Sequence, residues 1–337
     1  MNDYNHEILR KRHRNLIIVE GEKEENKLFQ IIFQTFPEID VSIDDILIYG
    51  TNIYVLYNDI IKEYGEMWFE EDVDLPFIVG KKKGYSKTLN VKDFSNVYLV
   101  FDYERHDPNF CEKKIEQMQR YFYDSADMGK LYLNYPMLES YQHFSYLPDI
   151  NYENLTVDVT IQPGSQYKKI VCNSFINKLI HIPHKIERLL FKDYDIRDIE
   201  TCKLYTKNIL DISSSKDIPE QISRILNGCL IPPELNRAIN HLNNLLECFE
   251  HIKSNMSYYE YMRYVFKQII IHNINKGSKI QKINIDKNDL ENIFELLDLN
   301  EILKEQNVVS KDDTRGFIWV LNTCVFLIPD YNFKLIK

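Results

Sequence analysis

Apolar and polar residues alternate in blocks along the first 150 residues of the chain. Four short, largely apolar runs lie at residues 16–19, 46–50, 97–101 and 131–136. Segments with helical spacing of apolar residues lie between them, at residues 23–36, 53–64 and 109–123. Short apolar runs bounded by turn residues are typical of buried parallel strands. Strands that alternate with helices predict right-handed βαβ units, and therefore an α/β domain whose mainly parallel sheet is flanked by helices.

The pattern changes after about Asp158, where long amphipathic segments begin. These segments cover residues 167–180, 183–190, 196–210, 219–226, 233–252, 258–273, 287–297 and 313–326. Their spacing of apolar residues predicts helices. We therefore expect two domains, an α/β domain at residues 1–158 and an all-α C-terminal domain at residues 159–337. The stretch 68–90 has no clear period and is expected to be an irregular loop.

Acidic side chains directly follow two of the predicted strands. Glu20 comes after the first apolar run, and Asp102 and Glu104 come after the third. Parallel sheets bind ligands beyond the carboxyl ends of their strands, and side chains at positions i and i+2 of an extended chain point the same way. We therefore expect these carboxylates to face one ion. Hard oxygen ligands suit Mg²⁺ and phosphoryl transfer, in which a spare carboxylate can move a proton.

Two segments carry these acids, VEGEKEENKLF around Glu20 and LVFDYE around Asp102. Together they resemble the TOPRIM domain, and the resemblance covers residues 13–145. It implies that Glu20 matches the family's metal-binding glutamate and that Asp102 and Glu104 match its acidic pair, with Mg²⁺ or Mn²⁺ as the cofactor. Glu104 departs from the family, which usually has Asp at this position. Its longer side chain either still binds metal or marks altered or lost activity.

The same resemblance extends to further residues in OLD-like, RloB-like and AriB-like TOPRIM nucleases. Glu24 resembles the second acid of their EGxxE form, and the segment YPMLESYQHF places Glu139 in the site. Arg105 and His106 directly follow the acidic pair, where they could hold a phosphate or transfer a proton. Each has an ordinary structural alternative. Glu24 and Glu139 suit the first turn of a helix, and Arg105 and His106 suit a solvated loop.

The resemblance implies a metal-dependent nuclease that cleaves phosphodiester bonds of DNA or RNA, including tRNA. Stand-alone TOPRIM proteins with a helical extension are effectors of anti-phage abortive infection, which implies an ABC-type ATPase partner or a homo-oligomer. Two alternatives stay open. The chain could be a catalytically inactive TOPRIM-like binding or regulatory subunit of a defence complex, or a primase-like nucleotidyltransferase. The sequence contains no GxxxxGK[ST] phosphate loop, which argues against ATP hydrolysis by this chain.

The charge of the chain limits how it can bind nucleic acid. Its 41 Lys and Arg residues stand against 51 Asp and Glu residues, and the net charge is -10. The whole excess lies in residues 1–150, which hold 17 basic and 27 acidic residues. Contact with a polyanion must therefore be local. The run Lys81, Lys82 and Lys83, expected in the loop before the third strand, is the candidate for such contact.

Three features predict a cytoplasmic protein that does not enter a membrane. The N-terminal segment MNDYNHEILRKRHRN is polar, unlike a signal peptide. The longest late apolar run, residues 317–329, is too short to span a bilayer. The six cysteines show no CxxC or other close ligand spacing, so we expect buried, reduced thiols.

Overall fold

The computed structural model describes residues 15–41, 45–84, 89–214, 216–247, 255–286 and 289–337. Its central feature is a five-stranded sheet with the strand order β2-β1-β3-β5-β4. The strands are β1 (Asn15–Val19), β2 (Ile46–Ile48), β3 (Asn96–Asp102), β4 (Tyr123–Asp124) and β5 (Gly129–Asn134). Strands β2, β1, β3 and β5 are parallel, whereas β4 at the edge pairs with β5 in the antiparallel sense. The predicted α/β class with a mainly parallel sheet is thus confirmed.

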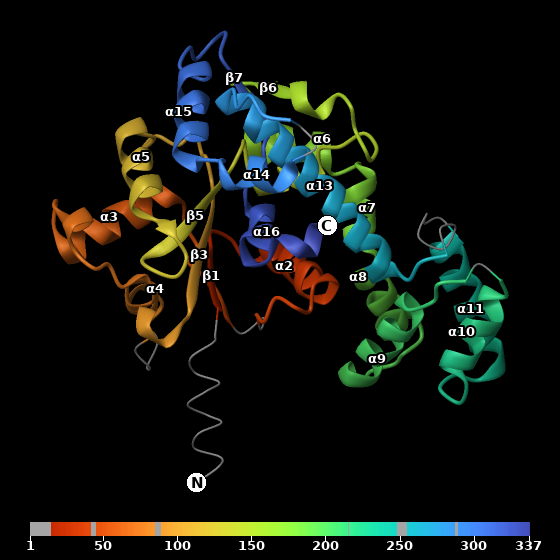
Figure 1. The fold of residues 1–337 in the computed structure, drawn as a ribbon. Coiled ribbons are helices and arrows are strands. Elements are labelled where there is room, and N and C mark those ends of the chain that lie inside the picture. The colour runs from red at the N-terminus through yellow and green to blue at the C-terminus, as the bar shows by residue number, and fades with distance from the viewer. Residues whose placement is uncertain (1–14, 42–44, 85–88, 215, 248–254, 287–288) are drawn as a thin grey trace. The chain divides into compact units, whose positions relative to one another are not determined.

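Helices cover both faces of this sheet (Figure 1). On one face lie α3 (Ile53–Tyr64), α4 (Leu75–Lys83) and α5 (Glu112–Tyr121), and on the other lies α2 (Lys23–Thr35). Because both faces are covered, the central strands are buried on both sides and are apolar along almost their whole length. In β1, for example, Ile17 and Ile18 have no exposed surface. This burial explains why the strands are visible in the sequence as continuous apolar runs.

The order of the strands creates a switch point between β1 and β3. The chain passes from β1 through α2 to β2 and then crosses back through α3 to β3, which pairs with β1. The helices that follow the two neighbouring strands, α2 and α5, lie on opposite faces of the sheet (Figure 1). Open α/β sheets bind ligands at such a point, because the diverging connections leave a crevice at the carboxyl ends. The topology therefore favours a site at the ends of β1 and β3.

The stretch 68–90, predicted to be an irregular loop, contains a 3-10 helix, Trp68–Glu70, and helix α4. The Asp74 side chain accepts a hydrogen bond from the Phe77 backbone N–H at 3.0 Å, and Gly84 ends the helix with a φ of 66°. An N-cap acid and a left-handed C-terminal glycine are strong local signals for a helix. The prediction of a loop here was wrong because the last turn carries three lysines, which erase the apolar period.

The last 70 residues complete the α/β unit. This region contains α14 (Leu290–Glu295), α15 (Leu299–Val309), α16 (Leu327–Tyr331) and the part of α13 (Tyr258–Gln281) from Gln268 onward. Residues 313–326, predicted to be a helix, instead contain β7 (Phe317–Trp319), which pairs antiparallel with β6 (Thr156–Asp158). That prediction was wrong because FIWVL is apolar at every position and fits a buried strand as well as a helix. The C-terminal region is therefore not entirely helical.

The chain divides into two compact units. Unit 1 comprises Met1–Ser174 and Gln268–Lys337, and unit 2 comprises Phe175–Lys267. This division differs from the predicted boundary near residue 158, because the β6–β7 pairing returns the C-terminal segment to the sheet-containing unit. The short helix α6 (Lys168–Val171) also belongs to unit 1. The helices of unit 2 are α7 (Phe175–Ile180), α8 (Ile182–Arg188), α9 (Ile199–Leu210), α10 (Ile218–Leu226) and α11 (Pro232–Glu247).

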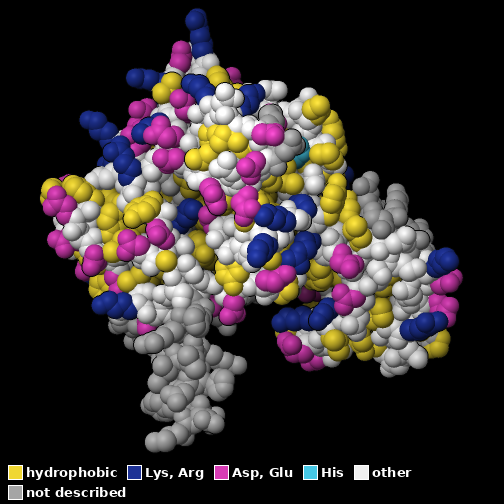
Figure 2. Space-filling model, in the orientation of Figure 1, with side chains coloured by type: hydrophobic (Ala, Val, Ile, Leu, Met, Phe, Trp, Pro, Cys, Tyr) yellow, Lys and Arg dark blue, Asp and Glu magenta, His cyan; other side chains and the backbone are white. Residues whose placement is uncertain are grey.

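Charge is unevenly divided between the units. The sequence of unit 1 holds 28 Lys and Arg against 39 Asp and Glu, and that of unit 2 holds 13 against 12. On the face drawn in Figure 2, acidic side chains are spread over much of unit 1.

The described cysteines are free thiols, and Cys172 is exposed, unlike the expected buried thiols. Among the described helices, none has the length and apolar character needed to span a membrane.

A buried polar network around Asn322 joins the C-terminal segment of unit 1 to the residues that follow β5. The Asn322 side chain donates hydrogen bonds to Leu138 O at 2.7 Å and to Ser140 Oγ at 3.1 Å. Its backbone N–H donates to Asn273 Oδ1 at 2.8 Å, and its Oδ1 accepts from Val325 N at 3.3 Å. Asn322 has no exposed surface. Its removal would leave several buried polar groups without partners, which costs more than the loss of a solvent-exposed hydrogen bond.

Replacing Asn322 tests this network. We expect Asn322→Ala to lower the free energy of unfolding of unit 1 by about 2–4 kcal/mol, because buried partners lose their hydrogen bonds. Urea denaturation followed by tryptophan fluorescence measures it, since Trp68 and Trp319 both lie in unit 1. The exposed Asn284 provides a matched control, whose change to Ala should alter stability by less than about 0.5 kcal/mol. Equal effects of the two changes would contradict the role given to Asn322.

Candidate metal centre

The ends of β1 and β3 carry the acidic residues that the sequence singles out. Glu20 directly follows β1, and its backbone continues the sheet by one residue, because Glu20 N donates to Val100 O at 3.2 Å and Gly50 N donates to Glu20 O at 2.8 Å. Asp102 is the last residue of β3, and its backbone N–H donates to Glu20 Oε2 at 3.2 Å. Regular strand pairing therefore fixes the backbone of both acids. The position at the switch point follows from the parallel register of β1 and β3.

Three carboxylates gather at this point. Glu20, Asp102 and Glu104 each offer one oxygen, and these oxygens all lie within 4.8 Å of one another. The intervening Tyr103 is fully buried, whereas the carboxylates of Asp102 and Glu104 both reach the Glu20 carboxylate. Three hard oxygen donors at this separation suit a small divalent cation, whose remaining positions would be open to water and substrate. The structure thus brings together the three residues predicted to be the main ligands.

The pKa values of the three acids are all raised. Burial raises the pKa of Glu20 to about 8, and the negative charge of Glu104 adds to this shift. Burial also raises the pKa of Asp102 well above its ordinary value, with further contributions from Glu20 and Glu139. The pKa of Glu104 is raised by burial and by the charge of Asp107. Desolvated carboxylates that repel one another are stabilised by protons or by a bound cation, so the donor set fits a metal ion.

Glu139 lies beside this cluster and not among its three members. It is on the 3-10 helix Leu138–Gln142 that follows β5, and only 5% of its surface is exposed. Its Oε1 is 2.9 Å from Lys168 Nζ. The same short helix approaches the cluster through its backbone, because Leu138 N donates to Asp102 Oδ1 at 2.7 Å. Glu139 is therefore a buried, ion-paired neighbour whose charge acts on Asp102.

Lys168 is a site residue that the sequence analysis missed. It begins α6, directly after a π-helical turn, Pro163–Tyr167. Burial alone would lower the pKa of Lys168, but its hydrogen bond to Glu139 and the charges of Glu139 and Asp102 raise it. Its charge also lowers the pKa of Glu104. No sequence signal separates Lys168 from its neighbour Lys169, since only the tertiary structure brings α6 to the acids.

Two acids on the first turn of α2 have different partners. Glu24, predicted as a supporting residue, pairs with Lys27 at 2.8 Å on the helix surface. Glu25 instead turns back toward the strand end, where its Oε1 accepts a hydrogen bond from Gly21 N at 3.0 Å. Burial raises the pKa of Glu25, and the charge of Glu139 contributes to the shift. Of these two acids, Glu25 is therefore the one that is turned toward the strand end carrying Glu20. The EGxxE spacing identified Glu24 instead.

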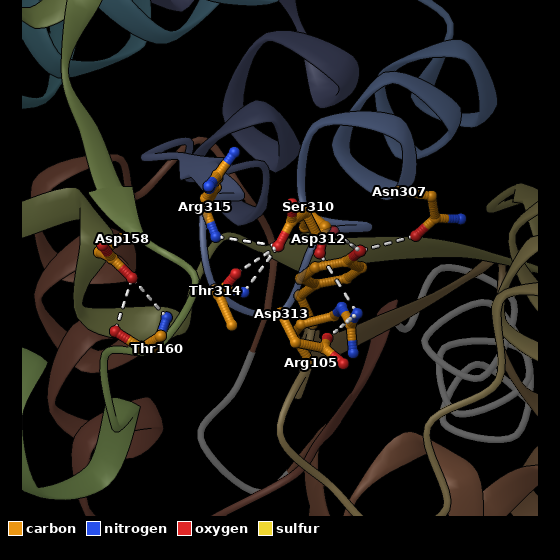
Figure 3. Close-up of polar contacts among 10 residues, drawn as sticks. Arg105, Asp158, Thr160, Asn307, Ser310, Asp312, Asp313, Thr314 and Arg315 are labelled. Carbon is orange, nitrogen blue, oxygen red and sulfur yellow. Dashed lines mark hydrogen bonds and ion pairs between the residues drawn. The ribbon is translucent and has the colours of Figure 1, made fainter.

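The residues on either side of Glu104 are held by the C-terminal segment of unit 1 (Figure 3). The Tyr103 hydroxyl donates to Asn307 Oδ1 at 2.7 Å and lies 3.0 Å from Ser310 Oγ. Arg105 donates to Ser310 O at 3.2 Å and to Asp313 Oδ1 at 2.7 Å. Glu104 itself has a φ of 49°, a left-handed conformation that costs a non-glycine residue about 1–2 kcal/mol. The flanking contacts stabilise this conformation and thereby aim the Glu104 carboxylate.

The other predicted site residues lie in different surroundings. Arg105 is occupied by the C-terminal segment and also lies over the Phe110 ring at 4.6 Å, so it does not point to the cluster as a free phosphate ligand. His106 has a buried Nε2 without a hydrogen-bond partner. The lysine run pairs with acids, since Lys81 lies 2.5 Å from Glu63 and Lys82 lies 3.3 Å from Asp59. These pairs reduce the positive charge that the run can offer to a polyanion.

Comparisons with known proteins add no assignment, because the chain matches no protein-family model, no curated protein and no solved structure. The candidate site therefore depends on its own geometry. The acids lie at a topological switch point, their oxygens are close together, and burial together with this proximity raises their pKa values. These features fit a cluster that could bind a cation.

The raised pKa of Glu20 predicts an unusual pH dependence of stability. The folded state binds a proton at Glu20 up to about pH 8, whereas the ordinary value is 4.5, so this contribution to stability is complete below pH 4.5 and is lost as the pH rises through 8. In metal-free protein at pH 8, we expect Glu20→Gln to raise the melting temperature by roughly 1–3 °C. The gain should shrink toward pH 5. Thermal melts in EDTA followed by tryptophan fluorescence measure both.

Glu22→Gln is the matched control for this experiment. Glu22 is exposed and caps α2 without a side-chain hydrogen bond, so its replacement should leave the pH dependence unchanged. Added Mg²⁺ should stabilise the parent protein at pH 8, because a ligand that binds the folded state raises its stability. A Glu20→Gln protein that melts below the parent at pH 8 in EDTA would contradict the proposed crowding of carboxylates.

Proposed function

We propose that the chain is a metal-dependent nuclease of the TOPRIM type that cleaves phosphodiester bonds of DNA or RNA. The observation that supports this function is the cluster of Glu20, Asp102 and Glu104 at the switch point between β1 and β3. Glu20, Asp102 and Glu104 would hold Mg²⁺ or Mn²⁺. The bound ion would supply Lewis-acid stabilisation of the charge that develops on the phosphoryl oxygens.

The residues around the cluster have separate tasks in this proposal. Asp102 and Glu104 serve as ligands, and their orientation depends on the buried Tyr103 between them. Glu20 is a ligand that can also accept or donate a proton at its carboxylate. Lys168 faces the acids with a side chain that is 45% exposed, so its ammonium group is accessible to a substrate phosphate. Glu139 holds Lys168 in this position through their ion pair at 2.9 Å.

The biological setting is proposed from the TOPRIM resemblance. A TOPRIM unit combined with a helical unit is similar in layout to effectors of bacterial anti-phage abortive infection. In that setting, the chain would form a homo-oligomer or work with an ABC-type ATPase partner, and that partner would keep the nuclease silent until infection. The alternative functions make different predictions. An inactive regulatory subunit would show no cleavage, and a primase-like nucleotidyltransferase would depend on nucleoside triphosphates.

Neutralising single carboxylates tests the nuclease. We expect Glu20→Gln and Asp102→Asn to lower the rate of Mg²⁺-dependent cleavage by roughly 10²–10⁴-fold, because each removes a ligand charge and Glu20→Gln also removes a proton-transfer group. Labelled DNA and RNA incubated with the full chain, in Mg²⁺ and in EDTA, provide the measurement. Glu22→Gln should cleave like the parent. Cleavage that survives in both site variants, or that requires nucleoside triphosphates, would refute hydrolysis at this site.

Lys168 can be tested separately with its neighbour as the control. We expect Lys168→Ala to lower cleavage on the order of 10²-fold, because the site loses the one side-chain cation that faces the acids among the described residues. Lys168→Arg should restore part of the activity, since it keeps the charge but changes its shape. The exposed Lys169 should tolerate replacement by Ala. Equal losses for the Lys168 and Lys169 variants would remove Lys168 from the site.

A further inference from the structure

Unit 2 contains a cavity of about 420 Å³ on the surface formed by α8, α9 and the turn between them. Three lysine or arginine side chains line it, Arg188 and Lys192 from the first helical segment and Lys203 from α9. The volume falls within the range of about 300–1,000 Å³ that small-ligand sites occupy. A cavity of this size has room for about one nucleotide. All residues that line this cavity belong to unit 2, whereas the candidate metal ligands belong to unit 1.

Arg188 and Lys192 line the cavity together with His184. Arg188 ends α8, and Lys192 lies on the π-helix Leu189–Asp193 that directly follows it. All three are exposed. Within the part of the chain that the structure describes, neither Arg188 nor Lys192 forms an ion pair with a carboxylate, whereas Lys203 lies 3.3 Å from Glu200. Such unpaired cations are available to an external anion without first breaking an internal salt bridge.

The wall between the cations is apolar. Phe191 and Ile199 line the cavity, and Ile199 is 60% exposed. One carboxylate, Glu187, also contributes to the lining and opposes three basic side chains. Phe191 is half-buried, and the Arg197 guanidinium lies over its ring at 5.2 Å. Basic side chains combined with an aromatic ring are features by which proteins hold single-stranded nucleic acids, through phosphate contacts and base stacking. An acidic peptide would use the cations but would not need the aromatic wall.

The two units differ in their net charge. Unit 1, which carries the candidate metal centre, holds 28 basic and 39 acidic residues, so its net charge repels a polyanion that comes within about one Debye length, about 8 Å at physiological salt. Unit 2 has a slight positive excess, 13 against 12. Two lysines of the run in α4 are engaged, Lys81 by Glu63 and Lys82 by Asp59. A nucleic-acid substrate thus needs a local basic contact, which the cavity in unit 2 provides.

We propose that this cavity binds a single-stranded segment of nucleic acid, with phosphates at Arg188, Lys192 and Lys203 and a base against Phe191. The inference rests on the proposed nuclease function and adds an anchoring site for its substrate away from the metal ligands. Each phosphate contact releases condensed counterions, so binding through the cavity weakens as the salt concentration rises. A base against the ring makes binding tolerant of sequence.

The test measures binding without cleavage. The probes are fluorescein-labelled DNA and RNA single strands of about 20 nucleotides, longer than a typical site of about 4–16 nucleotides. They are titrated with full-length Asp102→Asn protein in EDTA, and fluorescence anisotropy gives the Kd. We expect the added pair Arg188→Ala and Lys192→Ala to weaken binding on the order of tenfold and to lower the slope of log K against log salt by roughly 1.4, about 0.7 for each lost contact.

The matched control is the pair Lys207→Ala and Arg224→Ala, which removes one exposed lysine and one exposed arginine of unit 2 outside the cavity. It should leave the Kd within about twofold of the parent, since a distant surface charge contributes little. Lys203→Ala provides a second, single change in the cavity. Phe191→Ala should weaken binding while leaving the salt slope unchanged, because it removes stacking and no charge.

The outcomes separate this inference from the nuclease proposal. Equal weakening by the cavity pair and the control pair, or no weakening by any cavity variant, would overturn the inference even if Asp102→Asn abolishes cleavage. Displacement of the probes by polyglutamate at the same concentration of charge would assign the cavity to acidic protein segments and would also overturn it. Cavity-dependent binding without any Mg²⁺-dependent cleavage by the parent would instead refute the nuclease and leave the binding site standing.

Discussion

The parallel pairing of β1 with β3 is the constraint on which the candidate site depends. Its register places Val19 opposite Val100, so the chains leave both strands at one edge of the sheet and carry Glu20 and Asp102 with them. Both acids are half-buried there, and their pKa values rise through burial and mutual repulsion. A fold that concentrates negative charge at one half-buried point has a place for a cation.

Residues that are remote in the sequence also hold the site in place. The C-terminal segment reaches back to Tyr103 and Arg105, on either side of Glu104, across more than 200 residues. The buried Asn322 joins the same segment to the 3-10 helix that carries Glu139. Since Glu104 adopts a left-handed backbone, its orientation depends on these neighbours more than on local preference. The last 70 residues are therefore part of the catalytic unit of the proposed enzyme.

In the proposed nuclease, the two units would meet different requirements. A metal centre needs carboxylates, which repel a polyanionic substrate, and binding of that substrate needs cations, which would pair with the carboxylates if placed beside them. In unit 1, Lys168 is held by Glu139 and acts only at short range. Among the described residues, Arg188 and Lys192 of unit 2 form no ion pair with a carboxylate. Under the proposed function, such local basic contacts would allow an acidic chain to bind nucleic acid.

The sequence by itself determined the α/β class, the parallel strands and the acids at the ends of two of them, because buried strands are largely apolar runs and an acid directly follows the first and the third run. Only the tertiary structure decided that Lys168 and Glu25 face the cluster, that Arg105 turns to Asp313, and that residues 313–326 return as strand β7. These features depend on contacts between distant segments. Local periodicity reports which face of an element is buried, but it does not report the partner against which that face packs.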